Sequence, residues 1–134
     1  MSRIVVPRVF FEHMVGHCRS VYPHEACGLL AGKSGVVEKI YEMTNLDHSN
    51  ISYLMDPSEQ FSAMKEMRNE KNLMVAIYHS HPQSAPYPSE KDVRLAFYPD
   101  SVYIILSFLD FNHPEVRAYR IEEGDVREVK IELD

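Results

Sequence analysis

An apolar segment that ends in a pair of histidines is the feature that most restricts the fold of this chain. Residues 73–78, Leu-Met-Val-Ala-Ile-Tyr, form a nearly unbroken apolar run of the length typical of a buried strand. The strand should continue through His79-Ser-His81 and end at Pro82, because proline cannot donate a hydrogen bond to a neighbouring strand. Side chains two apart on a strand project from the same face, with Cα atoms about 7 Å apart. His79 and His81 can therefore reach one metal ion.

A short loop and a helix start follow this strand. Residues 83–88 contain prolines and serines, and Ser89-Glu-Lys-Asp92 has the pattern of a helix N-terminus with a capping box. The strand end and the helix start can thus bring two imidazole nitrogens and the Asp92 carboxylate to one point. Three protein ligands leave a fourth tetrahedral position for water, which is the composition of a catalytic zinc site.

A zinc-bound water still needs a protein base that accepts and delivers protons. Glu25 is the candidate, because it opens the small apolar segment Glu-Ala-Cys-Gly-Leu-Leu-Ala-Gly at 25–32, where packing alone rarely favours a glutamate. Gly28 in this segment allows another part of the chain to approach the backbone closely.

The spacing of these residues resembles the motif of the JAMM (MPN-plus) zinc metallopeptidases. A glutamate lies upstream, and His-Ser-His-Pro is followed by six residues, a serine, two residues and an aspartate. The resemblance covers nearly the whole chain, from about residue 4 to the C-terminal strands. It implies one Zn²⁺ per chain, held by His79, His81 and Asp92. It also implies that Glu25 is the general acid–base and that the Ser89 hydroxyl stabilises the developing oxyanion.

Within this family the chain resembles most the prokaryotic branch that processes ubiquitin-like sulfur-carrier proteins, through residues 53–56, 76–81 and 87–96. The known members of that branch include a peptidase that releases cysteine from a carrier protein. The resemblance implies hydrolysis after the C-terminal Gly-Gly of such a carrier, with release of cysteine or a short peptide. We expect the extended tail to pair with an exposed strand edge, for which residues 51–55 are the candidate.

The order of predicted elements indicates an α/β fold with a mixed sheet, because strands and helices alternate early and strands cluster late. Helices are predicted at 7–20, 57–71 and 89–96. Strands are predicted at 4–6, 26–31, 36–43, 51–55, 73–81, 101–109, 116–121 and 126–132, with a turn at 123–125. Together with the family resemblance, this predicts a single MPN/JAMM domain over residues 1–134, with a central mixed sheet flanked by helices.

Composition limits the partners and the compartment. The 134 residues carry a formal net charge of −6, which argues against nucleic acid as the main partner. No apolar run is long enough to span a membrane and no secretory signal precedes the first strand, so a cytoplasmic location is expected. Cys18 and Cys27 are expected to be free thiols. The sequence leaves open whether the protein is a monomer or a homodimer.

Several alternatives share parts of this pattern. The two motif histidines can be unrelated strand residues, and Ser89 with Asp92 can be a helix cap alone. His13 and His17 have a metal-like spacing, but the HExxH order is absent, which favours a solvated or packed pair. Other functional classes to be considered are a general or cell-wall peptide hydrolase, a RadC-like DNA-repair-associated protein and a non-catalytic MPN scaffold. A nucleoside deaminase would need a Pro-Cys-x-x-Cys motif, which the sequence lacks.

Overall fold

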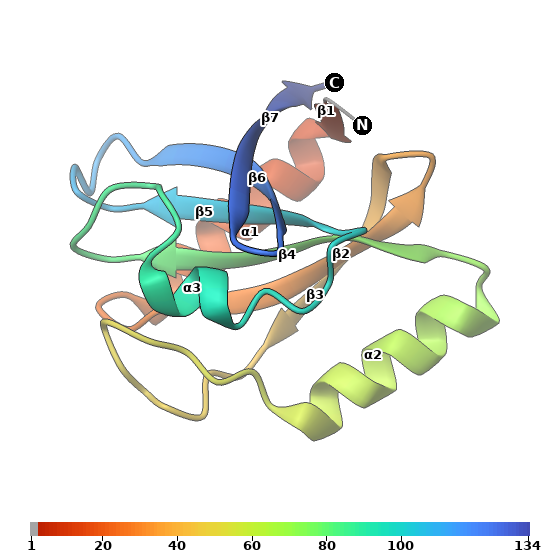
Figure 1. Cartoon of the computed structure of the whole chain (residues 1–134), viewed down its shortest axis with the longest axis horizontal. Helices are drawn as coiled ribbons and strands as arrows, with labels where there is room; N and C mark the ends of the chain where they lie inside the picture. Colours follow the sequence, from red (N-terminus) through yellow and green to blue (C-terminus); the bar gives the residue numbers. More distant parts are fainter. Residues whose placement is uncertain (1–2) are drawn as a thin grey trace.

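One mixed sheet of seven strands forms the centre of the computed structural model, which describes residues 3–134 (Figure 1). The sheet closes into a barrel in the order β1-β3-β2-β4-β5-β6-β7, because β7 pairs back with β1. Its strands are β1 Arg3–Val6, β2 Cys27–Lys33, β3 Val36–Met43, β4 Leu73–His81, β5 Val102–Ser107, β6 Glu115–Glu122 and β7 Asp125–Leu133. β1 runs parallel to β3 and β7, β4 runs parallel to β5, and the other pairs are antiparallel. The predicted mixed α/β sheet is confirmed.

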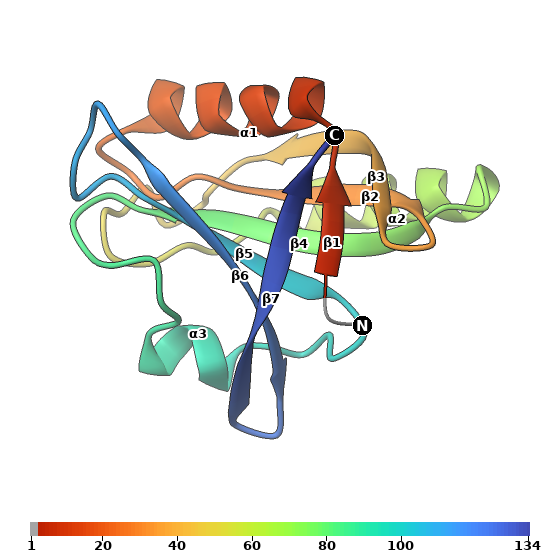
Figure 2. The ribbon, with the colours of Figure 1, turned by 90° about the horizontal axis from the view of Figure 1, so that it is seen from above.

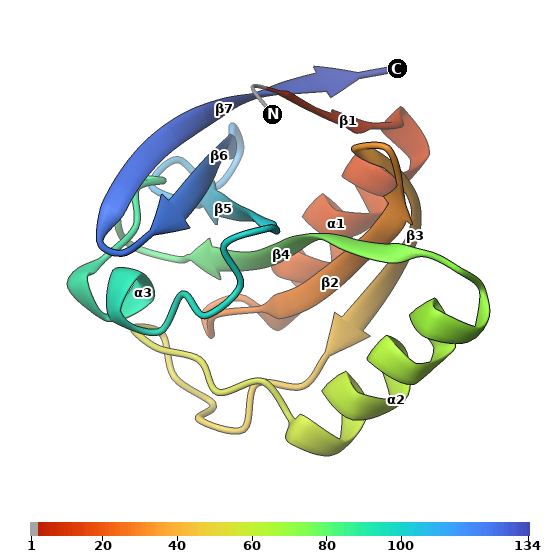
Figure 3. The same cartoon turned by 45° about the vertical axis from the view of Figure 1, so that its right-hand side comes forward.

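Three helices flank the strands: α1 Arg8–Val21, α2 Pro57–Asn69 and α3 Glu90–Arg94. Figure 2 shows α1 along one side of the sheet and α3 on the other, close to the carboxyl end of β4. Figure 3 shows α2 outside the curved sheet, alongside β3. None of the helices within residues 3–134 is long and apolar enough to cross a membrane.

Both faces of the central strands are buried, which explains why β4 reads as an unbroken apolar run. One hydrophobic cluster packs Met14 and Cys18 of α1 against the first face, and a second packs Ala63 and Met67 of α2 against the other. Neighbouring residues of one strand join different clusters, because successive side chains point to opposite faces. In β4, for example, Tyr78 belongs to the first cluster and Ile77 to the second.

The pairing of β2 with β4 sets the geometry at the end of β4. Cys27 lies opposite His79 in this antiparallel ladder. The ladder extends past the end of β2, where the Ser80 N–H donates to the Ala26 carbonyl at 3.1 Å and the Ala26 N–H donates to Ser80 Oγ at 2.8 Å. A Cβ on Gly28 would lie 2.3 Å from the Tyr78 ring, which confirms the close approach expected at this glycine.

Several predicted elements need correction, among them the helix predicted at 57–71, which ends at Asn69, and the strand predicted at 26–31, which spans Cys27–Lys33. Residues 51–55 are not a strand: they are irregular and carry one isolated bridge, Asn45 to Met55, because side-chain contacts occupy their backbone groups as described below. The helix predicted at 89–96 spans only Glu90–Arg94, and the strand predicted at 101–109 spans Val102–Ser107. The turn at 123–125 is confirmed, with positive φ angles at Glu123 and Gly124.

Candidate functional site

The end of β4 and the start of α3 bring three ligand atoms together. The His79 Nε2 and His81 Nε2 atoms lie 3.1 Å apart, and they lie 3.2 and 3.0 Å, respectively, from Asp92 Oδ2. Tetrahedral ligands bonded to zinc at about 2 Å lie about 3.3 Å apart, so this triangle has the size of one face of such a site. Within residues 3–134, no other group of three His, Cys, Asp or Glu side chains converges in this way.

The hydrogen bonding of His81 shows that the cluster suits a cation. Its Nδ1–H donates to the Ala85 carbonyl oxygen at 2.8 Å. In the neutral imidazole the lone pair of Nε2 therefore faces Asp92 Oδ2, which is also an acceptor. Two acceptors at hydrogen-bond distance repel each other unless a positive charge lies between them. A metal ion would satisfy both, together with the lone pair of His79 Nε2.

The surroundings of Asp92 favour its ionised form, the carboxylate. Its burial opposes ionisation, but the adjacent His79 and His81 outweigh this effect and keep the pKa of Asp92 well below its usual range. Asp92 also closes a capping box: its Oδ2 accepts from the Ser89 N–H at 2.9 Å, and its own N–H donates to Ser89 Oγ at 3.0 Å. Ser89 is thus a helix cap, and its hydroxyl hydrogen remains available to a ligand.

Glu25 lies two residues before the start of β2, on the same face of the ladder as His79 and His81. It is 4 % exposed, and burial raises its pKa to about 7, partly offset by attraction to His81. Its backbone is fixed on both sides, since its N–H donates to the Ser49 carbonyl at 2.7 Å and its carbonyl accepts from Asn45 Nδ2 at 3.0 Å. A carboxyl group that titrates near neutral pH is suited to accept and return a proton.

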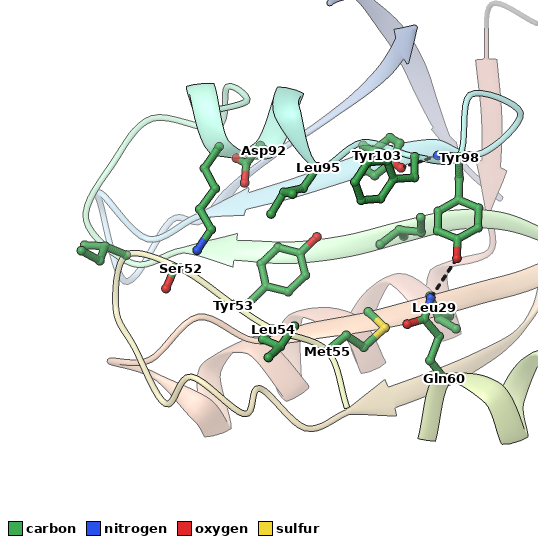
Figure 4. Close-up of a pocket in the computed structure, with 14 residues that line it drawn as sticks. Leu29, Ser52, Tyr53, Leu54, Met55, Gln60, Asp92, Leu95, Tyr98 and Tyr103 are labelled. Carbon is green, nitrogen blue, oxygen red and sulfur yellow. Dashed lines mark hydrogen bonds between the residues drawn. The ribbon is translucent and has the colours of Figure 1, made fainter. Parts of the chain in front are cut away.

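A groove of about 270 Å³ leads to this cluster (Figure 4). The groove is lined by residues of α3, residues 97–98, residues 51–55 and, from the sheet, Leu29, Ile77 and Tyr103. Figure 4 shows Asp92 and Leu95 on the side opposite Ser52 and Leu54. Tyr53 packs on the His79 ring with the ring centroids 4.7 Å apart. Most of the lining is apolar, so the groove suits an extended chain with small side chains.

One buried amide holds the wall formed by residues 51–55. Asn45 Nδ2 donates to the carbonyls of Glu25 and Ser52, at 3.0 and 3.1 Å, and Asn45 Oδ1 accepts from the N–H groups of Asp47 and Leu54, at 3.0 and 2.9 Å. Asn45 was not predicted as a site residue, because an asparagine in a polar loop gives no sequence pattern that indicates its contacts. The structure thus connects the position of Glu25 to the position of the groove wall.

Comparison with known families agrees with this geometry. A family model described as prokaryotic homologs of the JAB domain matches residues 7–122. The chain belongs to this family. The predicted JAMM/MPN resemblance is therefore confirmed, and so is the α/β fold that it implied.

Two curated relatives of this JAB-domain chain are named as peptidases. The CysO-cysteine peptidase of Mycobacterium tuberculosis is 40% identical over 132 residues, which cover 97% of this chain and 90% of the relative. A probable TtuB-protein conjugate cleaving protease of Thermus thermophilus is 32% identical, and the match covers 90% of this chain and 78% of that protein. A Desulfitobacterium hafniense protein with a known solution structure is 38% identical, with a TM-score of 0.88 over 98% of this chain and 92% of that one.

Other residues considered in the sequence lie outside the cluster of this JAB domain. Cys18 and Cys27 are free and buried, and burial raises the pKa of each thiol to about 12, which excludes them as nucleophiles. His17 is buried, with Nδ1 2.6 Å from the Tyr78 hydroxyl, and the exposed His13 lies 2.7 Å from Glu42 Oε2. The expectation of a packed or solvated histidine pair is confirmed.

Proposed function

We propose that this chain is a zinc-dependent peptidase that cleaves after the C-terminal Gly-Gly of a ubiquitin-like or sulfur-carrier protein and releases cysteine or a short peptide. The observation that carries the proposal is the convergence of His79, His81 and Asp92 beside a buried glutamate, at the end of an apolar groove. The activities named for the curated relatives, which cleave CysO and TtuB conjugates, support the same class of substrate.

In this proposal His79, His81 and Asp92 hold one Zn²⁺. When bound there, the ion would polarise the scissile carbonyl and lower the pKa of a water molecule in the remaining position. Glu25 accepts a proton from the attacking water and delivers it to the leaving amine, so that the peptide bond breaks without a covalent enzyme intermediate. The Ser89 hydroxyl, whose oxygen already accepts from the Asp92 N–H, donates its hydrogen to the oxyanion.

In this scheme the carrier tail lies in the groove. Residues 51–55 do not offer it a regular strand edge. The Ser52 carbonyl and the Leu54 N–H are bonded to Asn45, and the Leu54 carbonyl accepts from the Leu46 N–H at 2.8 Å. Within residues 3–134 no hydrogen-bond partner is found for the peptide groups of Tyr53 or for the N–H groups of Ser52 and Met55, so these groups can pair with an extended tail. Glycines fit such a narrow path because side chains would contact its walls.

Mass spectrometry of carrier proteins tests this function. The purified zinc-loaded protein is incubated with a ubiquitin-like carrier that ends in Gly-Gly-Cys and with the same carrier ending in Gly-Val-Cys. We expect release of cysteine from the first and a steep loss with the second. The His81→Ala variant is the inactive control. Efficient cleavage of unrelated peptides with bulky residues before the scissile bond would favour a general or cell-wall peptidase instead.

A further inference from the structure

Lys91 is a cation that lines the groove, and the proposed mechanism assigns no role to it. Among the residues that line the groove, only Lys91 and Asp92 are charged, and Asp92 is assigned to the metal cluster. Lys91 is exposed, and no acidic side chain within residues 3–134 forms an ion pair with it. An unpaired ammonium in an otherwise apolar groove suits a ligand that brings its own negative charge.

The position of Lys91 indicates where that charge would lie. Lys91 is in the first turn of α3, directly before Asp92, and it lines the groove together with Leu95 one turn later and with Ser52 on the opposite wall. Its charge lowers the pKa of Glu25, against the larger raising effect of burial, so its ammonium lies within electrostatic range of Glu25. Lys91 is therefore at the end of the groove where the scissile bond would lie.

A single amino acid as leaving group creates a specific electrostatic problem at this end. Its α-carboxylate is separated from the leaving nitrogen by only one carbon atom, so it must enter the region that contains Glu25 and Asp92. Two acidic side chains repel such a carboxylate, and a nearby ammonium offsets this repulsion. A leaving group attached through a lysine side chain, or an amide-blocked residue, brings no carboxylate to this point.

We propose that Lys91 binds the free α-carboxylate of a one-residue leaving group, and thereby directs the enzyme to carriers extended by a single amino acid rather than to side-chain conjugates. This inference rests on the proposed function, since it assigns the leaving group of the same reaction. Lys91 acts here as a specificity residue, because it contacts the substrate next to the bond that breaks.

Paired substrates test this assignment. The same carrier is prepared with Gly-Gly-Cys as a free acid and as a C-terminal carboxamide, and kcat/KM is measured for both. We expect the wild-type protein to prefer the acid by about tenfold, which is the scale of one charge-assisted hydrogen bond. Lys91→Gln should lose this preference by slowing only the acid, and Lys91→Arg should retain most of it. Added salt should weaken the preference because the pair is partly exposed.

Arg94→Gln is the matched control, because Arg94 is an exposed cation on the same helix that does not line the groove. It should leave the ratio of acid to amide unchanged. Equal rates for acid and amide in the wild-type protein, or equal losses on both substrates in Lys91→Gln, would overturn the role of Lys91 but leave the proposed peptidase in place. Failure of the zinc-loaded wild-type protein to cleave any carrier would overturn both.

Discussion

The cluster of His79, His81 and Asp92 and the groove wall are built in opposite ways, although they adjoin each other. The cluster takes His79 and His81 from a central strand and Asp92 from a capped helix, so regular hydrogen bonding fixes its geometry. The wall at residues 51–55 has no regular structure, and the side chain of Asn45 replaces a partner strand. Strand pairing and a helix cap thus fix the region assigned to bond cleavage. In contrast, the side-chain amide of Asn45 fixes the region assigned to substrate selection.

This contrast indicates how the two functions can change independently. A substitution in 51–55 alters what the groove admits without moving the strand that carries the histidines. Asn45 is the exception, because it bonds to the Glu25 carbonyl as well as to the wall.

Removing one ligand should abolish the function of the cluster. We expect His81→Ala to lose the zinc, about one per chain in the wild-type protein, and all measurable hydrolysis, because two ligands hold zinc far less tightly than three. Metal analysis of the purified variant measures this directly. His113→Ala, an exposed loop histidine, is the control. Full zinc occupancy in His81→Ala would refute the ligand assignment.

Glu25→Gln should separate proton transfer from metal binding. The amide cannot accept a proton from water, so kcat should fall by about 10²-fold or more while zinc content stays unchanged. Steady-state kinetics with parallel metal analysis provides the test, with the exposed Glu38→Gln as control. A variant that retains wild-type turnover would show that another group is the base.

The raised pKa of Glu25 predicts a pH-dependent stability of the metal-free protein. A carboxyl whose pKa rises from its ordinary value of 4.5 to about 7 on folding keeps its proton in the folded state at pH values where the unfolded chain releases it, so the fold loses stability as the pH rises from 4.5 to about 7. Glu25→Gln should therefore be more stable than wild type at pH 8, by about 3 kcal/mol at most. The difference should shrink as the pH falls through 7 and vanish near pH 4. Urea unfolding at each pH measures it, and a constant difference would contradict the burial effect.

Asn45→Ala should loosen the groove wall while the metal cluster stays intact. The substitution leaves the buried Glu25 carbonyl without its Asn45 partner, as well as the part-buried Ser52 carbonyl and Leu54 N–H, and an unsatisfied buried group costs about 1–3 kcal/mol. We expect a loss of about 2 kcal/mol in the free energy of unfolding and a several-fold higher KM for a carrier substrate, with zinc retained. Asn50→Ala, an exposed loop asparagine, is the control. Loss of zinc in Asn45→Ala would show that the two regions are not independent.

The cluster could be predicted from the sequence because its determinants are local. The apolar run of β4 defines a strand, strand parity places His79 and His81 on one face, and the cap pattern places Asp92 at a helix start. The burial of Glu25 follows from the apolar segment that it opens. Each of these inferences depends on neighbours within a few residues.

The groove wall and the barrel closure depend on contacts that no local pattern contains. The alternation Ile-Ser-Tyr-Leu-Met at 51–55 predicts a strand, but the Asn45 side chain satisfies the backbone there instead of a neighbouring strand. Alternation shows which face of a strand is buried, not which edges meet, so the pairing of β1 with β7 was not foreseen. Likewise, Lys91 in the first turn of α3 has the pattern of an ordinary solvated residue.

The pairing of β1 with β7 also has a consequence for folding kinetics. It joins Ile4 to Ile131 in a parallel ladder, so the barrel closes only when segments from opposite ends of the chain meet (Figure 2). Closing so long a loop costs conformational entropy before any stabilising contact forms. The pairing of β1 with β7 is therefore slower than the formation of local contacts. The proposed ligands His79, His81 and Asp92 are close in sequence and can assemble earlier. We therefore expect refolding to recover metal affinity before it recovers protection of the β1 and β7 amides from hydrogen exchange.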